Sequence, residues 1–375
     1  MAKTEHANAY GKLIRILIVL FVLTVVCLAG YVMMDKSIQV QQAENTLRAQ
    51  EENERLQQQY QQALAEQNAK LEQKEAVQWP VPKGDAREVL DLTGYPVLNA
   101  MNITATRQDL MTGGLLLLNH WHTQPKDFPE SELLSIVSVD KNVPVSGSSV
   151  RLFPNAINAL IEMLNAAKAD GLENFLIDEG YRTNEAQQEY YDKEAARYSD
   201  RYSGDALINK VRLNVNVPGT SEYQSGLAFR VDRYLRGDAE FNDAKFQTTP
   251  HSDWLVENSW KYGFVFRFPV QDYPNDTMED RSYKTGESKK MSVYRYVGQG
   301  NAAVMHAMNF CMEEYIEYLV QHPHIALYEN GVLKYEVVRQ EYNGAASAQV
   351  EVARSAKDYT VSMDNMGGVI VCMSY

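Results

Sequence analysis

The longest apolar run of the chain extends from Ile16 to Met34 and contains no charged side chain. A run of about 20 apolar residues can cross a bilayer as one helix. Basic residues outnumber acidic ones in the short segment before it, so the positive-inside rule places the N-terminus in the cytoplasm and the remainder outside. A cleaved signal peptide is the alternative, but the run is longer than a usual signal-peptide core and its small-residue cleavage pattern is poor. We therefore expect a cytoplasmic tail at residues 1–15 and an uncleaved transmembrane helix at residues 16–34.

A polar, Gln-rich stretch follows at residues 35–78 and contains neither Pro nor Gly. Leu47, Leu56 and Leu64 belong to a patchy apolar stripe, which predicts a helix with irregular heptads. Two interpretations stay open. The helix could be a coiled coil that makes the protein a homodimer, or it could be a single-helix stalk that holds the rest of the chain away from the membrane.

From residue 79 onward, apolar positions recur with the periods of both helices and short strands. Helical periodicity predicts helices at residues 150–169, 184–197, 254–262 and 301–321. Short apolar runs predict strands at residues 175–177, 213–217, 227–234, 264–268 and 294–297. Because the two kinds of element alternate irregularly, the pattern favours an α+β fold. Residues 322–375 contain strand-like runs around an Asn330-Gly331 turn and predict a small β appendage.

Composition and charge exclude several classes of protein. The chain has 375 residues, with 36 Lys and Arg against 49 Asp and Glu, for a net charge of −13. Nucleic-acid binding needs clustered positive charge, so we expect no nucleic-acid partner. Three Cys cannot form a disulfide-rich scaffold. Whether Cys311 and Cys372 form a single bond stays open.

Six blocks of sequence, in the same order, resemble the VanY-type D-alanyl-D-alanine carboxypeptidases, zinc metallopeptidases whose fold also includes hedgehog signalling domains. The blocks are GLLLLNHWHTQPKDF, EGYRTNEAQ, PGTSEYQSGLAFRVD, WKYGFVFRFP, TGESKKMSVYRYVG and EEYIEYL. The resemblance implies a small antiparallel sheet with flanking helices at residues 113–321, preceded by a linker and lead-in at residues 79–112. It also implies a place in the bacterial envelope and relatives that act on peptidoglycan.

The same resemblance shows that the chemical groups of the family's site are changed. The family's two zinc-binding His residues correspond to Tyr223 and Val293, its zinc-binding Asp to Arg230, and its catalytic Glu to Lys290. Val has no donor atom and Arg stays protonated, so neither can bind zinc. Lys290 would be a cation in place of a general base. We therefore expect no zinc or other cofactor and no catalytic residue.

Other polar residues of the family's site are kept or lie near it. The possible ligand-binding residues are Arg182, Gln187, Ser221, Arg230 and Lys290. The possible internal ion-pair partners are Glu179, Glu222 and Asp232. If the Arg and Lys side chains are accessible to solvent, they suit an anion such as a peptide carboxylate. If internal ion pairs neutralise them, the pocket is filled and the residues maintain the fold.

The sequence therefore predicts a membrane-anchored, extracytoplasmic pseudopeptidase that binds peptidoglycan stem peptides or an envelope partner protein. Two alternatives stay open. One is an active D-alanyl-D-alanine carboxypeptidase that remodels peptidoglycan through a non-standard site. The other is a purely structural envelope scaffold.

Overall fold

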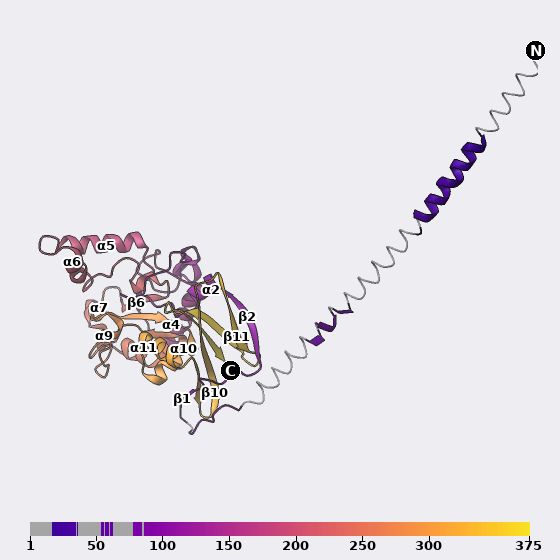
Figure 1. The fold of residues 1–375 in the computed structure, drawn as a ribbon. Helices are drawn as coiled ribbons and strands as arrows, with labels where there is room; N and C mark the ends of the chain where they lie inside the picture. Colours follow the sequence, from indigo (N-terminus) through magenta and orange to yellow (C-terminus); the bar gives the residue numbers. More distant parts are fainter. Residues whose placement is uncertain are drawn as a thin grey trace, which may run out of the picture. The chain divides into compact units, whose positions relative to one another are not determined.

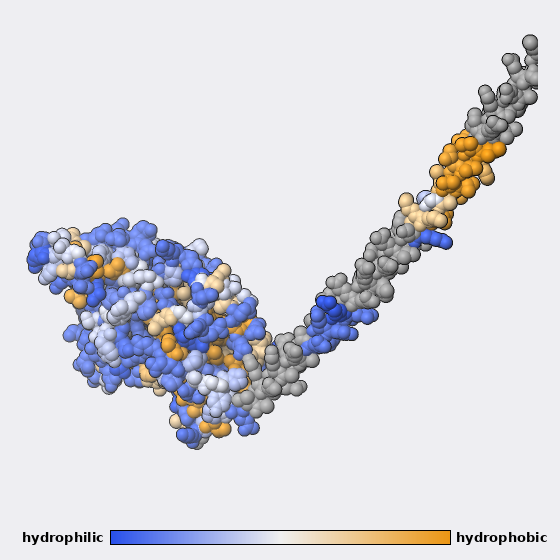
Figure 2. All heavy atoms as spheres, viewed as in Figure 1, coloured by the Kyte–Doolittle hydropathy of each residue, from blue (hydrophilic) through white to orange (hydrophobic). Residues whose placement is uncertain are grey.

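The computed structural model describes residues 17–34, 36, 54–55, 57–59, 61–62, 78–84 and 86–375. The chain forms two compact units, Met1–Gln73 and Lys74–Tyr375. In the first unit, Leu17–Met34 is a helix long and apolar enough to cross a membrane, and it is the orange segment of Figure 2. Such a helix is compatible with a single membrane span or with a signal sequence. The coiled coil at residues 35–78 falls mostly outside the described residues and stays a prediction.

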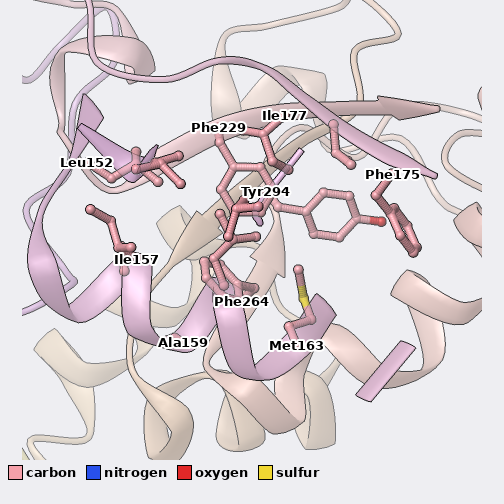
Figure 3. Packing of buried hydrophobic residues seen from close by; sticks show 14 of the residues in the cluster. Leu152, Ile157, Ala159, Met163, Phe175, Ile177, Phe229, Phe264 and Tyr294 are labelled. Atoms are coloured by element: carbon pink, nitrogen blue, oxygen red, sulfur yellow. The ribbon is translucent and has the colours of Figure 1, made fainter. Parts of the chain in front are cut away.

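A four-stranded antiparallel sheet forms the centre of the second unit. Its order is β5-β6-β8-β7, with bounds Phe175–Glu179, Ala228–Arg233, Val293–Tyr296 and Phe264–Phe266. The helix α4 (Pro154–Ala169) packs on it through a cluster that includes Ile157, Met163, Phe229 and Tyr294 (Figure 3). Along β6 the side chains alternate, so Phe229 and Val231 enter this core while Arg230 and Asp232 lie on the opposite face.

A second, larger sheet joins the two ends of the unit. Its order is β1-β9-β10-β13-β12, with bounds Glu88–Asp91, His324–Glu329, Val332–Glu341, Gly368–Ser374 and Asp358–Met363. A further pair joins β11 (Ser347–Ala353) to β2 (Ala100–Thr106). Strands β1 and β2 come from the predicted lead-in, so that segment is part of the folded unit and not a linker. The C-terminal strands likewise are not a separate appendage.

The remaining elements lie around these sheets (Figure 1). They are α2 (Arg107–Thr112), η1 (Glu130–Glu132), β3 (Leu134–Ser135), α3 (Ile136–Val139), β4 (Arg151–Leu152), α5 (Asn184–Ala196), α6 (Gly204–Val211), η2 (Glu222–Gln224), α7 (Ala239–Asp243), η3 (Phe246–Thr248), α8 (Pro250–Asn258), η4 (Ser259–Tyr262), α9 (Ser282–Thr285), α10 (Gln299–Met308) and α11 (Met312–Gln321). The α+β class is thereby confirmed.

Two predicted elements differ from the structure. The helix expected at residues 301–321 is broken into α10 and α11, because Asn309 adopts a left-handed conformation with φ of 53°. The strand expected at residues 213–217 is a loop after α6, since it pairs with no other strand. Cys311 and Cys372 are both buried free thiols.

Candidate functional site

The β6–β8 pairing and the turn before β6 bring together three of the four changed positions. Arg230 on β6 is the direct register partner of Val293 on β8, and its other neighbour is Glu179 on β5. Tyr223 lies on η2, in the turn that leads into β6. The side-chain amide of Gln224 holds this turn, accepting from the backbone N–H of Gly219 at 2.7 Å.

Two of the positions that the resemblance assigns to zinc ligands lie in one apolar cluster. Tyr223 and Val293 are buried in one small hydrophobic cluster with Ala228 and Phe268. Val293 is completely buried, and burial raises the pKa of Tyr223 above its usual value, so the phenol stays protonated. Tyr223 and Val293 therefore offer a metal ion no anionic donor.

The third position, Arg230, is neutralised by a residue that the sequence did not single out. Its Nε lies 2.8 Å from Oδ1 of Asp178 and its Nη2 lies 2.6 Å from Oδ2, which is a two-point ion pair. Glu179 is more distant, at 3.8 Å. Asp232, which we expected as a partner, is exposed and accepts only the backbone N–H of Arg233. The hydrogen bond with Asp178 raises the pKa of Arg230 further.

The positive charge of Arg182 is also neutralised within the chain. Its guanidinium forms an ion pair with Glu179 and donates to Oε1 of Gln187 at 2.7 Å. The same group lies over the rings of Tyr190 and Tyr223, 4.4 and 4.8 Å from their centroids. Gln187 in turn donates to the backbone carbonyl of Asn216, which fixes its orientation. Arg182 and Gln187 therefore hold β5, α5 and η2 together.

Lys290 does not take part in this cluster. Its side chain is exposed, and the structure gives it no ion-pair partner among residues 86–375. Ser221 is buried beside Tyr223, at the start of η2, and donates its backbone N–H to Gln224 at 3.4 Å. The five possible ligand-binding residues thus do not form one open cationic pocket.

Glu222 belongs to a different, fully buried ionic network. Its carboxylate pairs with Arg295 and, at 2.6 Å, with Nε of Arg267. Arg267 also contacts Glu313 of α11 at 2.7 Å. Burial opposes ionisation of Glu222, but the two guanidinium groups overcome it, so its pKa lies below the usual range. We expected Glu222 to neutralise Arg230 or Lys290, and this expectation is wrong.

The residues present do not fit a zinc ion. Over residues 86–375 and the short described parts before them, no group of three or more His, Cys, Asp or Glu could hold a metal. His120 and His122, which are two residues apart, form hydrogen bonds instead with the backbone carbonyl of Gly286 and the side chain of Asn119. A positive guanidinium stands where the resemblance places a carboxylate ligand, and it would repel a cation.

Comparisons with known proteins agree with the sequence blocks. The family described as VanY, D-alanyl-D-alanine carboxypeptidase, matches residues 149–283. A D-alanyl-D-alanine carboxypeptidase of Enterococcus faecium is 28% identical over 277 residues, covering 73% of this chain and 79% of the relative.

A second relative and one solved structure extend this likeness. The bifunctional D-Ala-D-Ala dipeptidase and carboxypeptidase VanXYC of Enterococcus gallinarum is 31% identical over 155 residues, covering 41% of this chain and 73% of the relative. The crystal structure of the vancomycin resistance D,D-dipeptidase VanXYg, in complex with a D-Ala-D-Ala phosphinate analogue, has the same fold. Its TM-score is 0.56 at 19% identity, covering 74% of this chain and 99% of that one.

Proposed function

Because the chain belongs to the VanY-type D-alanyl-D-alanine carboxypeptidase family of zinc metallopeptidases, we propose that it is a member that does not hydrolyse peptides and acts by binding at the cell envelope. One observation carries this proposal. Where the resemblance places zinc ligands, Tyr223 and Val293 lie in one apolar cluster and Arg230 is bound to Asp178.

The chemistry of the family explains why these changes matter. Hydrolysis by a zinc peptidase needs about three protein ligands, an open position for water and a carboxylate base near that water. The base position holds Lys290, and a lysine ammonium group offers hydrogen-bond donors but no acceptor. Each of the four changes is sufficient to weaken the site, and together they remove both the metal and the base.

The closed ion pairs favour an envelope protein as the binding partner over a stem peptide held in the old pocket. A terminal carboxylate could reach Arg182 or Arg230 only by displacing Glu179 or Asp178. One observation supports the stem peptide as a second candidate. The Arg230 side chain is 43% exposed, so its guanidinium is accessible from solvent.

The purified chain is expected to contain far less than one zinc ion per molecule and to release no D-alanine from a peptide ending in D-Ala-D-Ala. Atomic absorption and an amino-acid oxidase assay measure these two quantities. The Enterococcus faecium relative is the positive control. Stoichiometric zinc together with D-alanine release that a chelator abolishes would contradict the proposal. Titrating the same sample with the peptide tests the second candidate, since saturable binding that Arg230→Ala removes would support it.

We also propose that Leu17–Met34 is an uncleaved membrane anchor with the Lys74–Tyr375 unit outside the cell. The support is the apolar helix and the excess of basic residues before it. Protease added to spheroplasts should remove an epitope tag at the C-terminus and spare one at the N-terminus. A mature chain that begins after residue 34 by mass spectrometry would instead identify a signal sequence.

A further inference from the structure

A cleft separate from the former peptidase site lies between α4 and the C-terminal sheet. Its volume is about 280 Å³, and it is bordered by α4, by η4 and the start of α10, and by β10, β12 and β13. None of Arg182, Tyr223 and Arg230 lines it. Most of the wall lies beyond residue 283, where the family match ends, so the matched segment alone does not form the cleft.

Four tyrosines give the cleft its aromatic character. They are Tyr262, Tyr296, Tyr335 and Tyr359. Two of the rings pack against neighbouring aromatic side chains. Tyr262 stacks on Trp254 with centroids 6.2 Å apart, and Tyr296 meets the edge of Phe264 at 5.5 Å. Across residues 86–375, no chain cation lies over any of these four rings, and none of their hydroxyl groups has a hydrogen-bond partner.

Further polar groups of the wall are also free for a ligand. Neither the amides of Asn158 and Gln299 nor the Thr360 hydroxyl has a hydrogen-bond partner in the described part of the chain. The carboxylate of Glu162 is similarly free, and that of Asp358 accepts only the adjacent backbone N–H of Tyr359. The wall therefore presents donors and acceptors together, next to aromatic faces.

The charge of the cleft limits the class of ligand. Its wall contains two carboxylates and no Lys, Arg or His. An anion would meet repulsion from Glu162 and Asp358 without a compensating cation. Burial, reinforced by these two carboxylates, raises the pKa of Tyr296. The Tyr296 hydroxyl consequently stays protonated and can donate a hydrogen bond at neutral pH.

We propose that this cleft binds a neutral saccharide. A sugar ring has an apolar face that can lie on a tyrosine ring, and its hydroxyl groups both donate and accept, which matches the mixed unpartnered groups of the wall. The volume is near the lower end of the range for small-molecule sites, about 300–1,000 Å³, and suits about one or two sugar rings. An organic ammonium ion is the competing ligand, because tyrosines and carboxylates also attract cations. The unpartnered donors Asn158, Gln299 and Thr360 favour the saccharide, since an ammonium ion offers them no acceptor.

The test uses the full chain in octaethylene glycol dodecyl ether, a detergent whose headgroup is neither a sugar nor an ammonium. Isothermal titration calorimetry is run with three probes, which are cellotetraose, chitotetraose and choline chloride. We expect saturable binding of at least one of the two tetrasaccharides and none of choline. If neither tetrasaccharide binds at concentrations to about 10 mM, or if choline alone saturates the protein, the proposal is wrong.

Matched variants locate the binding. Tyr359→Ala and Asp358→Asn change exposed side chains of the cleft, and each is expected to raise the Kd of the bound tetrasaccharide about tenfold. Tyr283→Ala removes a 65% exposed tyrosine from α9, outside the cleft, and should leave the Kd unchanged. Saccharide binding that survives both cleft variants would place the sugar elsewhere and overturn the assignment. The inactivity of the peptidase site is a separate matter, because none of these variants touches it.

Discussion

Replacing Glu222 by Gln is expected to lower the free energy of unfolding of the Lys74–Tyr375 unit by about 3–5 kcal/mol. Glu222 is the anion between Arg267 and Arg295, and both guanidinium groups are completely inaccessible to solvent. A neutral amide leaves one buried positive charge without compensation, because only Glu313 remains to balance two arginines. The change is in the carboxylate alone, so shape and packing are preserved.

Urea unfolding monitored by tryptophan fluorescence measures this effect as a lower midpoint with an unchanged slope. The matched control is Glu173→Gln, which removes a solvent-exposed partner of Lys168 and should cost less than about 1 kcal/mol. Because the folded pKa of Glu222 is lowered, its contribution is complete above its unfolded value near 4.5 and is lost as pH falls through the folded pKa. Equal midpoints for Glu222→Gln and Glu173→Gln at pH 7 would show that the network contributes little.

Combining Tyr223→His, Arg230→Asp and Val293→His is expected to give a chain that binds about one zinc ion, where the unchanged chain binds none. Arg230 and Val293 are cross-strand partners, and such pairs have Cβ atoms about 4.5–5.5 Å apart, close enough to share a metal. Tyr223 and Val293 already belong to one cluster. Removing Arg230 also frees the carboxylate of Asp178, whose negative charge then favours a cation.

Zinc content after gel filtration, together with a competition titration against a chromogenic chelator, measures this gain. The control combines Tyr223→His with Arg230→Asp and keeps Val293, so it has two ligands and should bind zinc at least about tenfold more weakly. Near-UV circular dichroism verifies that both variants are folded. A folded triple variant without zinc would mean that these three positions are not where the family holds its metal.

Local periodicity was sufficient to predict α4, β5 and β6, since each buries one regular face. The partner of Arg230 was not predictable in the same way. On a regular strand, Asp178 and Glu179 point to opposite faces, so only one of the two is expected to be an ion-pair partner of Arg230. The pairing of β5 with β6 is irregular between Ile177 and Glu179, and this places both carboxylates beside Arg230.

The buried ionic network around Glu222 was not predicted, for a different reason. Glu222, Arg267 and Glu313 lie far apart in the sequence, and each belongs to a different block of the family resemblance. Only the tertiary arrangement shows that the three side chains meet. An Arg in a short strand-like run, such as Arg267 in FVFRFP, was the one available indication, because a charge inside a buried strand needs a partner.

The pairing of β1 with β9 and of β2 with β11 has a consequence for how such proteins diversify. The segment that the family description matches, residues 149–283, omits every one of these strands and also α10 and α11. Two of the three largest hydrophobic clusters are built mainly from the omitted parts. The segment that the family description matches is therefore smaller than the unit that folds in this chain. A protein that shares only that segment must cover the same apolar faces with other sequence, and new binding surfaces can arise there.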